Sequence, residues 1–177
     1  MRQTQYAAGM DDEDPDVWEP GDRIEHDRMV ARLLVLAQMV LIGSVAAAAW
    51  AHGPGGLVWL GAGVAWVGVA LGVWSAVVLG RGLTASPIPN GLVELRRIGP
   101  YRFVRHPMYS AVLAVGLGAV IWSGGWLTAL CWALLAVLLR VKAVWEEHHL
   151  MEVFPGYEAY AEATPRFWAW PGRDRAE

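Results

Sequence analysis

The sequence predicts an all-α, polytopic membrane protein with about four transmembrane helices and a cytoplasmic C-terminal helical cap. Composition is the first reason: of 177 residues, 55% are hydrophobic, only 18% are charged and 11 are tryptophan. An ordinary soluble domain is less apolar than this. The second reason is that the apolar residues lie in long blocks, because 30–50, 57–79 and 126–144 can each cross a hydrocarbon core of about 20 residues. A fourth block, 108–123, is somewhat short for a span unless it begins near Val104.

Charge divides the chain into three parts. Residues 1–28 contain nine acidic and three basic residues, and we expect them to form a disordered, acidic cytoplasmic tail. Residues 29–79 are expected to form the first two transmembrane helices, from Met29 to Trp50 and from Leu57 to Leu79. Residues 80–177 form the remaining core: a cytoplasmic loop, a transmembrane hairpin that turns at Gly124-Gly125, and a cap. In that cap we expect the last transmembrane helix to continue to about Val153 and to stop at Pro155-Gly156, followed by a short piece over 157–163.

The arginines predict the orientation. The loops 51–56 and 124–125 contain no lysine or arginine, whereas the loop 80–107 contains five arginines. Basic residues favour the cytoplasmic side, so both termini and this loop are expected in the cytoplasm of a multi-pass integral membrane protein. The low lysine content favours a bacterial source and hence the bacterial inner membrane. The five arginines of the loop 80–107 are Arg81, Arg96, Arg97, Arg102 and Arg105.

Two polar clusters lie at the predicted cytoplasmic boundary. One is the stretch from Gly99 to Tyr109, and the other is the stretch from Arg140 to Leu150. Because the Gly124-Gly125 hairpin makes the last two spans antiparallel, the clusters should be neighbours. We expect the first to bring Arg105, His106 and Tyr109 against the second, which supplies Glu146, Glu147 and His149. Carboxylates, a histidine and tyrosines that converge at a membrane boundary indicate either a functional site or a plain interfacial salt-bridge cluster.

The C-terminal half contains an ordered series of motifs. They are Gly99-Pro100-Tyr101-x-x-x-Arg105-His106-Pro107-x-Tyr109, Glu146-Glu147-x-x-Leu150, Phe154-Pro155-Gly156-Tyr157-x-x-Tyr160 and Thr164-Pro165-Arg166. In this order the motifs resemble the isoprenylcysteine carboxyl methyltransferase and phospholipid methyltransferase family. The resemblance covers about residues 80–170, including Pro87-x-Pro89.

This resemblance implies an integral membrane methyltransferase that uses S-adenosylmethionine. The acceptor would be a lipophilic small molecule or a lipid-attached group, either a carboxylate or an amine, at the cytoplasmic membrane interface. The expected partners are therefore that substrate and membrane lipids, with no nucleic acid. The matched motif positions assign Arg105, His106 and Glu147 to catalysis and Gly99, Tyr101, His106, Tyr109 and Glu146 to cofactor binding.

Two alternatives stay open at this point. Arg105-His106-Pro107-x-Tyr109 is also similar to the C-terminal region of membrane reductases of the sterol-reductase kind, which use NADPH. A non-catalytic helical scaffold is the other alternative. We predict no metal site, because Glu146 and His149 share a helix face without a third well-spaced ligand. The single cysteine, Cys131, lies in an apolar run and predicts no disulfide.

Overall fold

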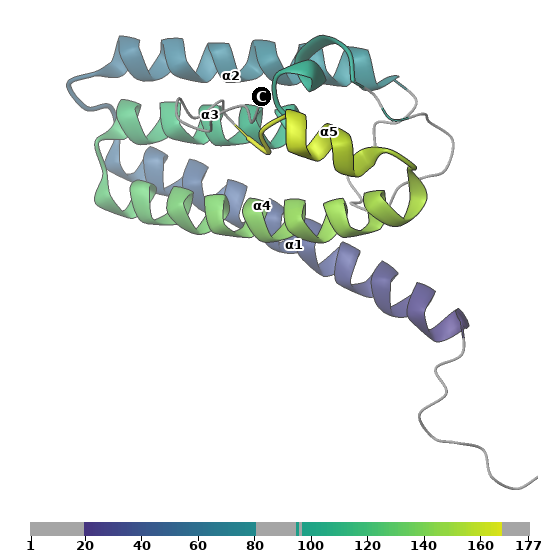
Figure 1. The fold of residues 1–177 in the computed structure, drawn as a ribbon. Coiled ribbons are helices and arrows are strands. Elements are labelled where there is room, and N and C mark those ends of the chain that lie inside the picture. Colours follow the sequence, from purple (N-terminus) through teal and green to yellow (C-terminus); the bar gives the residue numbers. More distant parts are fainter. Residues whose placement is uncertain (1–19, 81–94, 96, 168–177) are drawn as a thin grey trace, which may run out of the picture.

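Four long helices run side by side, and short helical elements cover one end of them (Figure 1). This computed structural model describes residues 20–80, 95 and 97–167. No strand occurs in these residues, which confirms the all-α prediction. The elements are α1 (Pro20–His52), α2 (Val58–Leu79), the 3-10 turn η2 (Gly99–Arg102), α3 (Pro107–Ser123), α4 (Trp126–Val153) and α5 (Tyr157–Ala163).

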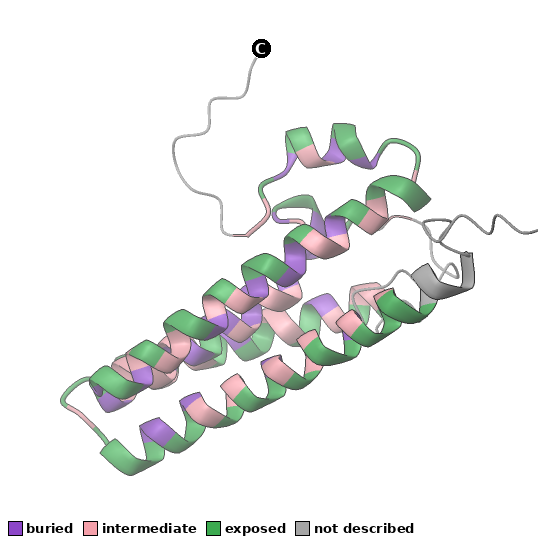
Figure 2. Ribbon diagram, turned by 90° about the horizontal axis from the view of Figure 1, so that it is seen from below, coloured by how far each residue is buried: buried purple, intermediate pink, exposed green. Residues whose placement is uncertain are grey.

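Three of the helices are long and apolar enough to cross a membrane. They cover Glu25–His52, Val58–Leu79 and Trp126–Val153. A helix satisfies its own backbone hydrogen bonds, which hydrocarbon cannot do, so apolar runs of this length become helices in a bilayer. Their outward faces are exposed, as the colours in Figure 2 show, and they carry large apolar side chains, with Trp59 at 89% and Val77 at 74% relative exposure. Such faces suit contact with lipid.

The fourth apolar helix, α3, is shorter, with 17 residues, and it does not begin near Val104. His106 has non-helical backbone angles (φ −120°, ψ 65°) and precedes Pro107, the first helical residue. A residue before proline is disfavoured in the helical region, so the helix cannot extend backward through His106. Helices α1, α2 and α4 all pack against α3.

Helix α1 begins earlier than the predicted span. It starts at Pro20 rather than at Met29, so the last part of the acidic tail is helical. Proline followed by acidic residues is a favourable way to begin a helix, because proline lacks an N–H to satisfy and acids complement the helix dipole. Residues 1–19 of the tail, Arg81, Arg96 and the Pro87-x-Pro89 segment lie outside the described residues.

Helices α2 and α3 approach closely through glycines. A Cβ placed on Gly68 would lie 2.8 Å from the backbone nitrogen of Val115, and one on Gly72 would lie 3.4 Å from the Cβ of Ala111. Both glycines therefore face α3, in agreement with a packing role for their small-xxx-small spacing. Across the same interface, α2 and α3 bury Gly61 and Gly118 against each other's backbone.

We expect Gly68→Ala to destabilise the protein, because the backbone that its Cβ would meet cannot move aside without separating α2 from α3. Overpacking of this kind costs about 1–3 kcal/mol. Gly63→Ala on the same helix is the matched control, since nothing lies within 4 Å of a Cβ there. Thermal denaturation of the two variants in detergent measures the difference. Equal midpoints would contradict the close contact at Gly68.

The other half of the bundle is built by α1 and α4. Side chains from α1, α3 and α4 form its core, with Val45, Leu113, Leu135 and Leu139 buried together. The predicted hairpin turn is confirmed: Gly124 has a left-handed backbone (φ 64°) and its N–H bonds to the Val120 carbonyl. Helices α3 and α4 are consequently antiparallel. The start of α3 and the last turns of α4 lie at the same end, together with η2 and α5, and we call this the polar end of the bundle (Figure 1).

The predicted cap is also present. Helix α4 continues without interruption to Val153, and Gly156 then reverses the chain with a left-handed backbone (φ 84°). On α5, Tyr157 and Tyr160 are buried, and the Tyr160 hydroxyl donates a hydrogen bond to the Tyr101 carbonyl of η2. The Arg97 guanidinium donates to the Gly156 carbonyl over 2.8 Å and lies above the Tyr160 ring. These contacts hold α5 against η2.

Candidate functional site at the polar end

The carboxylate of Glu147 is the centre of the polar end. It is buried on α4, with 3% of its side chain exposed. Its Oε1 lies 3.0 Å from Arg105 Nε, from His106 Nε2 and from Arg166 Nε, and its Oε2 lies 2.6 Å from Arg166 Nη2. A buried carboxylate is tolerated when opposite charges and hydrogen bonds surround it. Glu147, Arg105, His106 and Arg166 are called the ion-pair cluster below.

Backbone hydrogen bonds bring the chain after α5 onto the start of α3. The N–H of Arg105 donates to the Pro165 carbonyl over 2.9 Å, and the N–H of His106 donates to the Arg166 carbonyl over 3.0 Å. The Arg105 guanidinium also donates to the Ala161 carbonyl. Because of this pairing, segments that are 60 residues apart lie together around Glu147.

Glu146 has a different environment from its neighbour. A quarter of its side chain is exposed, and its Oε2 accepts a hydrogen bond of 2.7 Å from the Tyr109 hydroxyl. The same oxygen lies 3.8 Å from Nδ1 of His106. The His106 and Tyr109 rings stack in parallel, with 5.2 Å between their centres. Two adjacent glutamates therefore differ: Glu147 is enclosed by cations, whereas Glu146 reaches solvent beside an aromatic pair.

Tyr101 adds a third aromatic side chain near Glu146. Burial and, next, the negative charge of Glu146 raise the pKa of the Tyr101 hydroxyl well above its usual range. Tyr101 therefore stays protonated at any physiological pH and can act as a hydrogen-bond donor. On α5, burial raises the pKa of Tyr160 to about 12, although Arg105 acts in the opposite direction.

The structure brings together most of the residues that the sequence places here, but not all. Arg105, His106, Tyr109, Glu146 and Glu147 lie in direct contact with one another, as expected. His149 does not join them, and that expectation was wrong. It turns to the other face of α4, where it packs on the Trp145 ring and its Nε2 lies 3.4 Å from Asp27 of α1.

Gly99 lies at the edge of the site, and its backbone conformation and close packing explain why this position is a glycine. Its backbone is left-handed (φ 60°), and a Cβ there would come within 2.8 Å of the Val78 side chain on α2.

Arg166 is the residue whose place sequence reasoning missed. The Thr164-Pro165-Arg166 motif was noticed, but nothing in it identifies Glu147, 19 residues earlier, as the partner.

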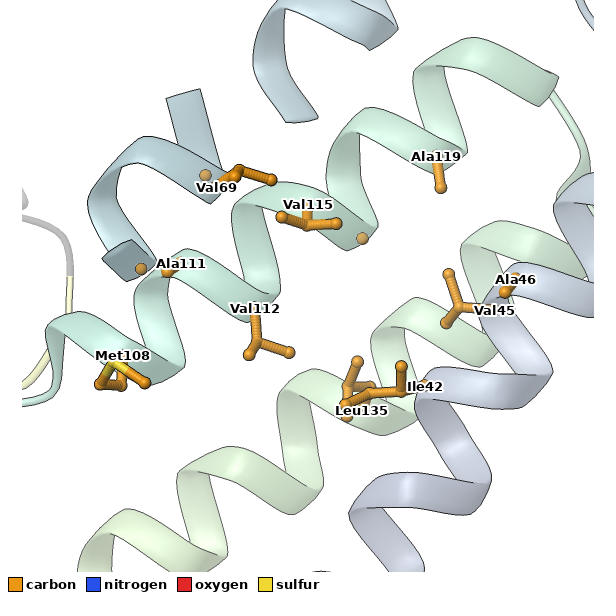
Figure 3. Close-up of a pocket in the computed structure, with 13 residues that line it drawn as sticks. Ile42, Val45, Ala46, Val69, Met108, Ala111, Val112, Val115, Ala119 and Leu135 are labelled. Atoms are coloured by element: carbon orange, nitrogen blue, oxygen red, sulfur yellow. The ribbon is translucent and has the colours of Figure 1, made fainter. Parts of the chain in front are cut away.

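An apolar cavity of about 310 Å³ lies along α3, from Met108 to Ala119. Among the described residues, its lining consists only of glycines and aliphatic or methionine side chains from all four long helices. Figure 3 shows Met108 at the end where α3 begins, next in sequence to Tyr109, and Ala119 toward the other end. Cavities that bind small ligands begin at about this size.

No group of three or more histidine, cysteine, aspartate or glutamate side chains converges as metal ligands in the part of the chain that the structure describes. His148 and Glu152, both exposed, form a separate pair, with Nε2 3.7 Å from Oε1. This pair lies on the solvent side of α4, away from the ion-pair cluster.

Comparison with known proteins identifies relatives of this chain. The family model for phospholipid methyltransferases matches residues 57–156, which include α2, η2, α3 and α4. The nickel-cobalt-cadmium resistance protein NccN of Alcaligenes xylosoxydans xylosoxydans is 39% identical over 115 residues, which are 62% of this chain and 52% of NccN. The chain thus spans about half the length of this curated relative. No solved structure matches this chain.

Proposed function

This chain belongs to the phospholipid methyltransferase family, and we propose that it uses S-adenosylmethionine to methylate a lipophilic acceptor, a carboxylate or an amine, at the membrane interface. The family match supports membrane methyltransferase activity in general. One observation carries the finer proposal: a solvent-reaching carboxylate, Glu146, lies beside stacked His106 and Tyr109 at the mouth of a membrane helix bundle.

The residues around Glu146 fit the chemical groups of that cofactor. S-adenosylmethionine carries an ammonium, a sulfonium, a carboxylate and an adenine, and it supplies the methyl group as an electrophile. Glu146 would pair with a positive group through its exposed part, since charge-assisted hydrogen bonds are the strong ones. The face of Tyr101 would suit adenine stacking or a cation–π contact with the sulfonium, whereas the Tyr109 ring already carries His106 and Lys142.

The ion-pair cluster would hold this site in place. Arg105 and Arg166 direct their guanidinium groups at Glu147, so their charge is used within the protein. Glu147 in turn holds Nε2 of His106, and this contact orients the ring that stacks on Tyr109. That Arg105, His106 and Glu147 take part directly in the chemistry stays a prediction; their contacts favour orientation of the neighbouring groups.

The apolar cavity supports a lipophilic acceptor. Its lining offers hydrocarbon contact only, and its Met108 end adjoins the residue that holds Glu146. Methyl transfer is a direct displacement in which the charges of the reactants are lost or shifted, so alignment and a dry site assist it. An amine acceptor must also lose a proton, and His106 Nδ1, 3.8 Å from Glu146, is a candidate to receive it. A carboxylate acceptor needs no base.

We also propose the orientation that the arginines predict, with both termini on the cytoplasmic side. The described part of the polar end contains Arg97, Arg102, Arg105 and Arg166, whereas the loops at the opposite end contain no basic residue except His52 and no acidic one. A bacterial inner membrane is consistent with this distribution.

Calorimetric titration of the detergent-purified full chain with S-adenosylmethionine, S-adenosylhomocysteine and NADPH tests the proposal. We expect saturable binding of the first two and none of NADPH. Binding of NADPH alone would indicate that the protein is a reductase rather than a methyltransferase. Binding of none of the three, by protein shown to be folded, would favour a scaffold. Transfer of radioactive methyl groups to membrane lipids or to added hydrophobic acids and amines would then distinguish O- from N-methylation.

A further inference from the structure

A lysine is buried where α1, α3 and α4 meet. Lys142 lies one helical turn before Glu146 on α4, and only 2% of the residue is exposed. Its Nζ lies 2.7 Å from Oε1 of Gln38 on α1 and 5.2 Å from the centre of the Tyr109 ring on α3. A buried cation among membrane helices is costly, so its presence calls for a role.

The contacts of Lys142 lead to the candidate site. Its ammonium lies over the ring of Tyr109, and the hydroxyl of the same ring donates to Glu146. The other neighbour of that ring is His106, which stacks on it in parallel. Tyr109 is therefore held by three groups at once, and the direction of its hydroxyl decides where the Glu146 carboxylate points.

Gln38 connects this arrangement to the first helix. It is 9% exposed, whereas the other buried residues in the described part of α1 are apolar, and its partner is 104 residues away. An amide oxygen can accept a hydrogen bond from an ammonium without adding a charge of its own to the bundle. Residue 38 lies outside the stretch 57–156 that the family model matches.

We propose that Gln38 and Lys142 are a positioning pair for the cofactor site: Gln38 fixes the Lys142 ammonium, which fixes Tyr109 and through it Glu146. This inference rests on the proposed function. It assigns to α1, which the family match does not include, an indirect part in setting cofactor affinity, and it explains why a costly cation is kept inside the bundle.

The test is a double-mutant cycle on affinity for S-adenosylhomocysteine, measured by calorimetry with the full chain in detergent. We expect Gln38→Leu and Lys142→Met each to weaken binding about tenfold, the effect of losing one hydrogen bond to a charged group. Because the two act in series, the double variant should bind no worse than the weaker single variant. Gln38→Glu retains the oxygen acceptor and should retain most of the affinity.

Arg140→Met is the matched control, because it removes a cation two residues earlier on the same helix at an exposed position. It should bind like the wild type. Thermal midpoints of all variants are recorded together, and a role in helix packing alone would lower those midpoints without changing affinity. If Lys142→Met does not fold, the contrast between Gln38→Leu and Gln38→Glu decides.

Wild-type affinity in Gln38→Leu, or losses that simply add in the double variant, would overturn the positioning pair while leaving the proposed function intact. Failure of the wild-type protein itself to bind either S-adenosyl compound is a separate result. It would overturn the proposed function, and the positioning role would fall with it.

Discussion

Glu147→Gln should detach the C-terminal segment from the bundle. The substitution retains size but removes the negative charge that two arginines and a histidine face, and it leaves those groups, which are at most a quarter exposed, without their common counter-ion. Removing one member of a buried ion pair costs about 3–5 kcal/mol. For a chain of this size such a loss lowers the thermal midpoint by about 10 °C.

Glu152→Gln is the matched control for this experiment. It makes the same chemical change on the same helix, but the Glu152 side chain is 65% exposed and its contact with His148 is long, at 3.7 Å. Exposed pairs of this kind contribute about 0–1 kcal/mol. Thermal denaturation in detergent measures stability, and tryptic cleavage after Arg166 reports release of the segment. If the two variants denature at the same temperature and resist trypsin equally, Glu147 does not hold the polar end together.

Much of this fold could be predicted because a bilayer narrows the choices. Apolar runs of span length must become helices, and Gly124-Gly125 must reverse the chain between two of them. The continuation of α4 to Val153 and the short α5 also follow from local signals, since Pro155-Gly156 separates them. The error at the start of α1 has a local cause as well: hydropathy marks the hydrocarbon-crossing part of the helix, not its first helical residue.

The sequence predicts the contacts of the site only where a local feature, such as the hairpin turn, brings two segments together. The antiparallel hairpin brings Arg105, His106 and Tyr109 to Glu146 and Glu147. This contact could be predicted because the hairpin lies between the two motifs in the sequence. The side on which His149 points depends on the rotation of α4 about its axis. Spacing alone does not settle this rotation over the last turns. The partnerships of Arg166 with Glu147 and of Gln38 with Lys142 join segments that no motif connects.

The second large effect is expected at Glu146. Glu146→Gln should lower the affinity for S-adenosylmethionine by about tenfold or more, because a charged hydrogen bond of about 1.5–3 kcal/mol is lost. Stability should change little, since a quarter of this side chain is exposed and the amide can still accept from the Tyr109 hydroxyl. Calorimetric titration and thermal denaturation of one preparation give both quantities.

Adjacent glutamates on one helix thus predict opposite phenotypes. Glu147→Gln should lower the thermal midpoint, whereas Glu146→Gln should keep the midpoint and lose affinity for S-adenosylmethionine. Glu152→Gln should change neither quantity. The separation follows from environment alone, because only Glu147 is enclosed by cations while only Glu146 meets solvent beside the His106 and Tyr109 rings. A Glu146→Gln protein that binds S-adenosylmethionine as tightly as the wild type would remove this carboxylate from the cofactor site. Attention would then move to Tyr101 and His106 as the residues that hold the cofactor.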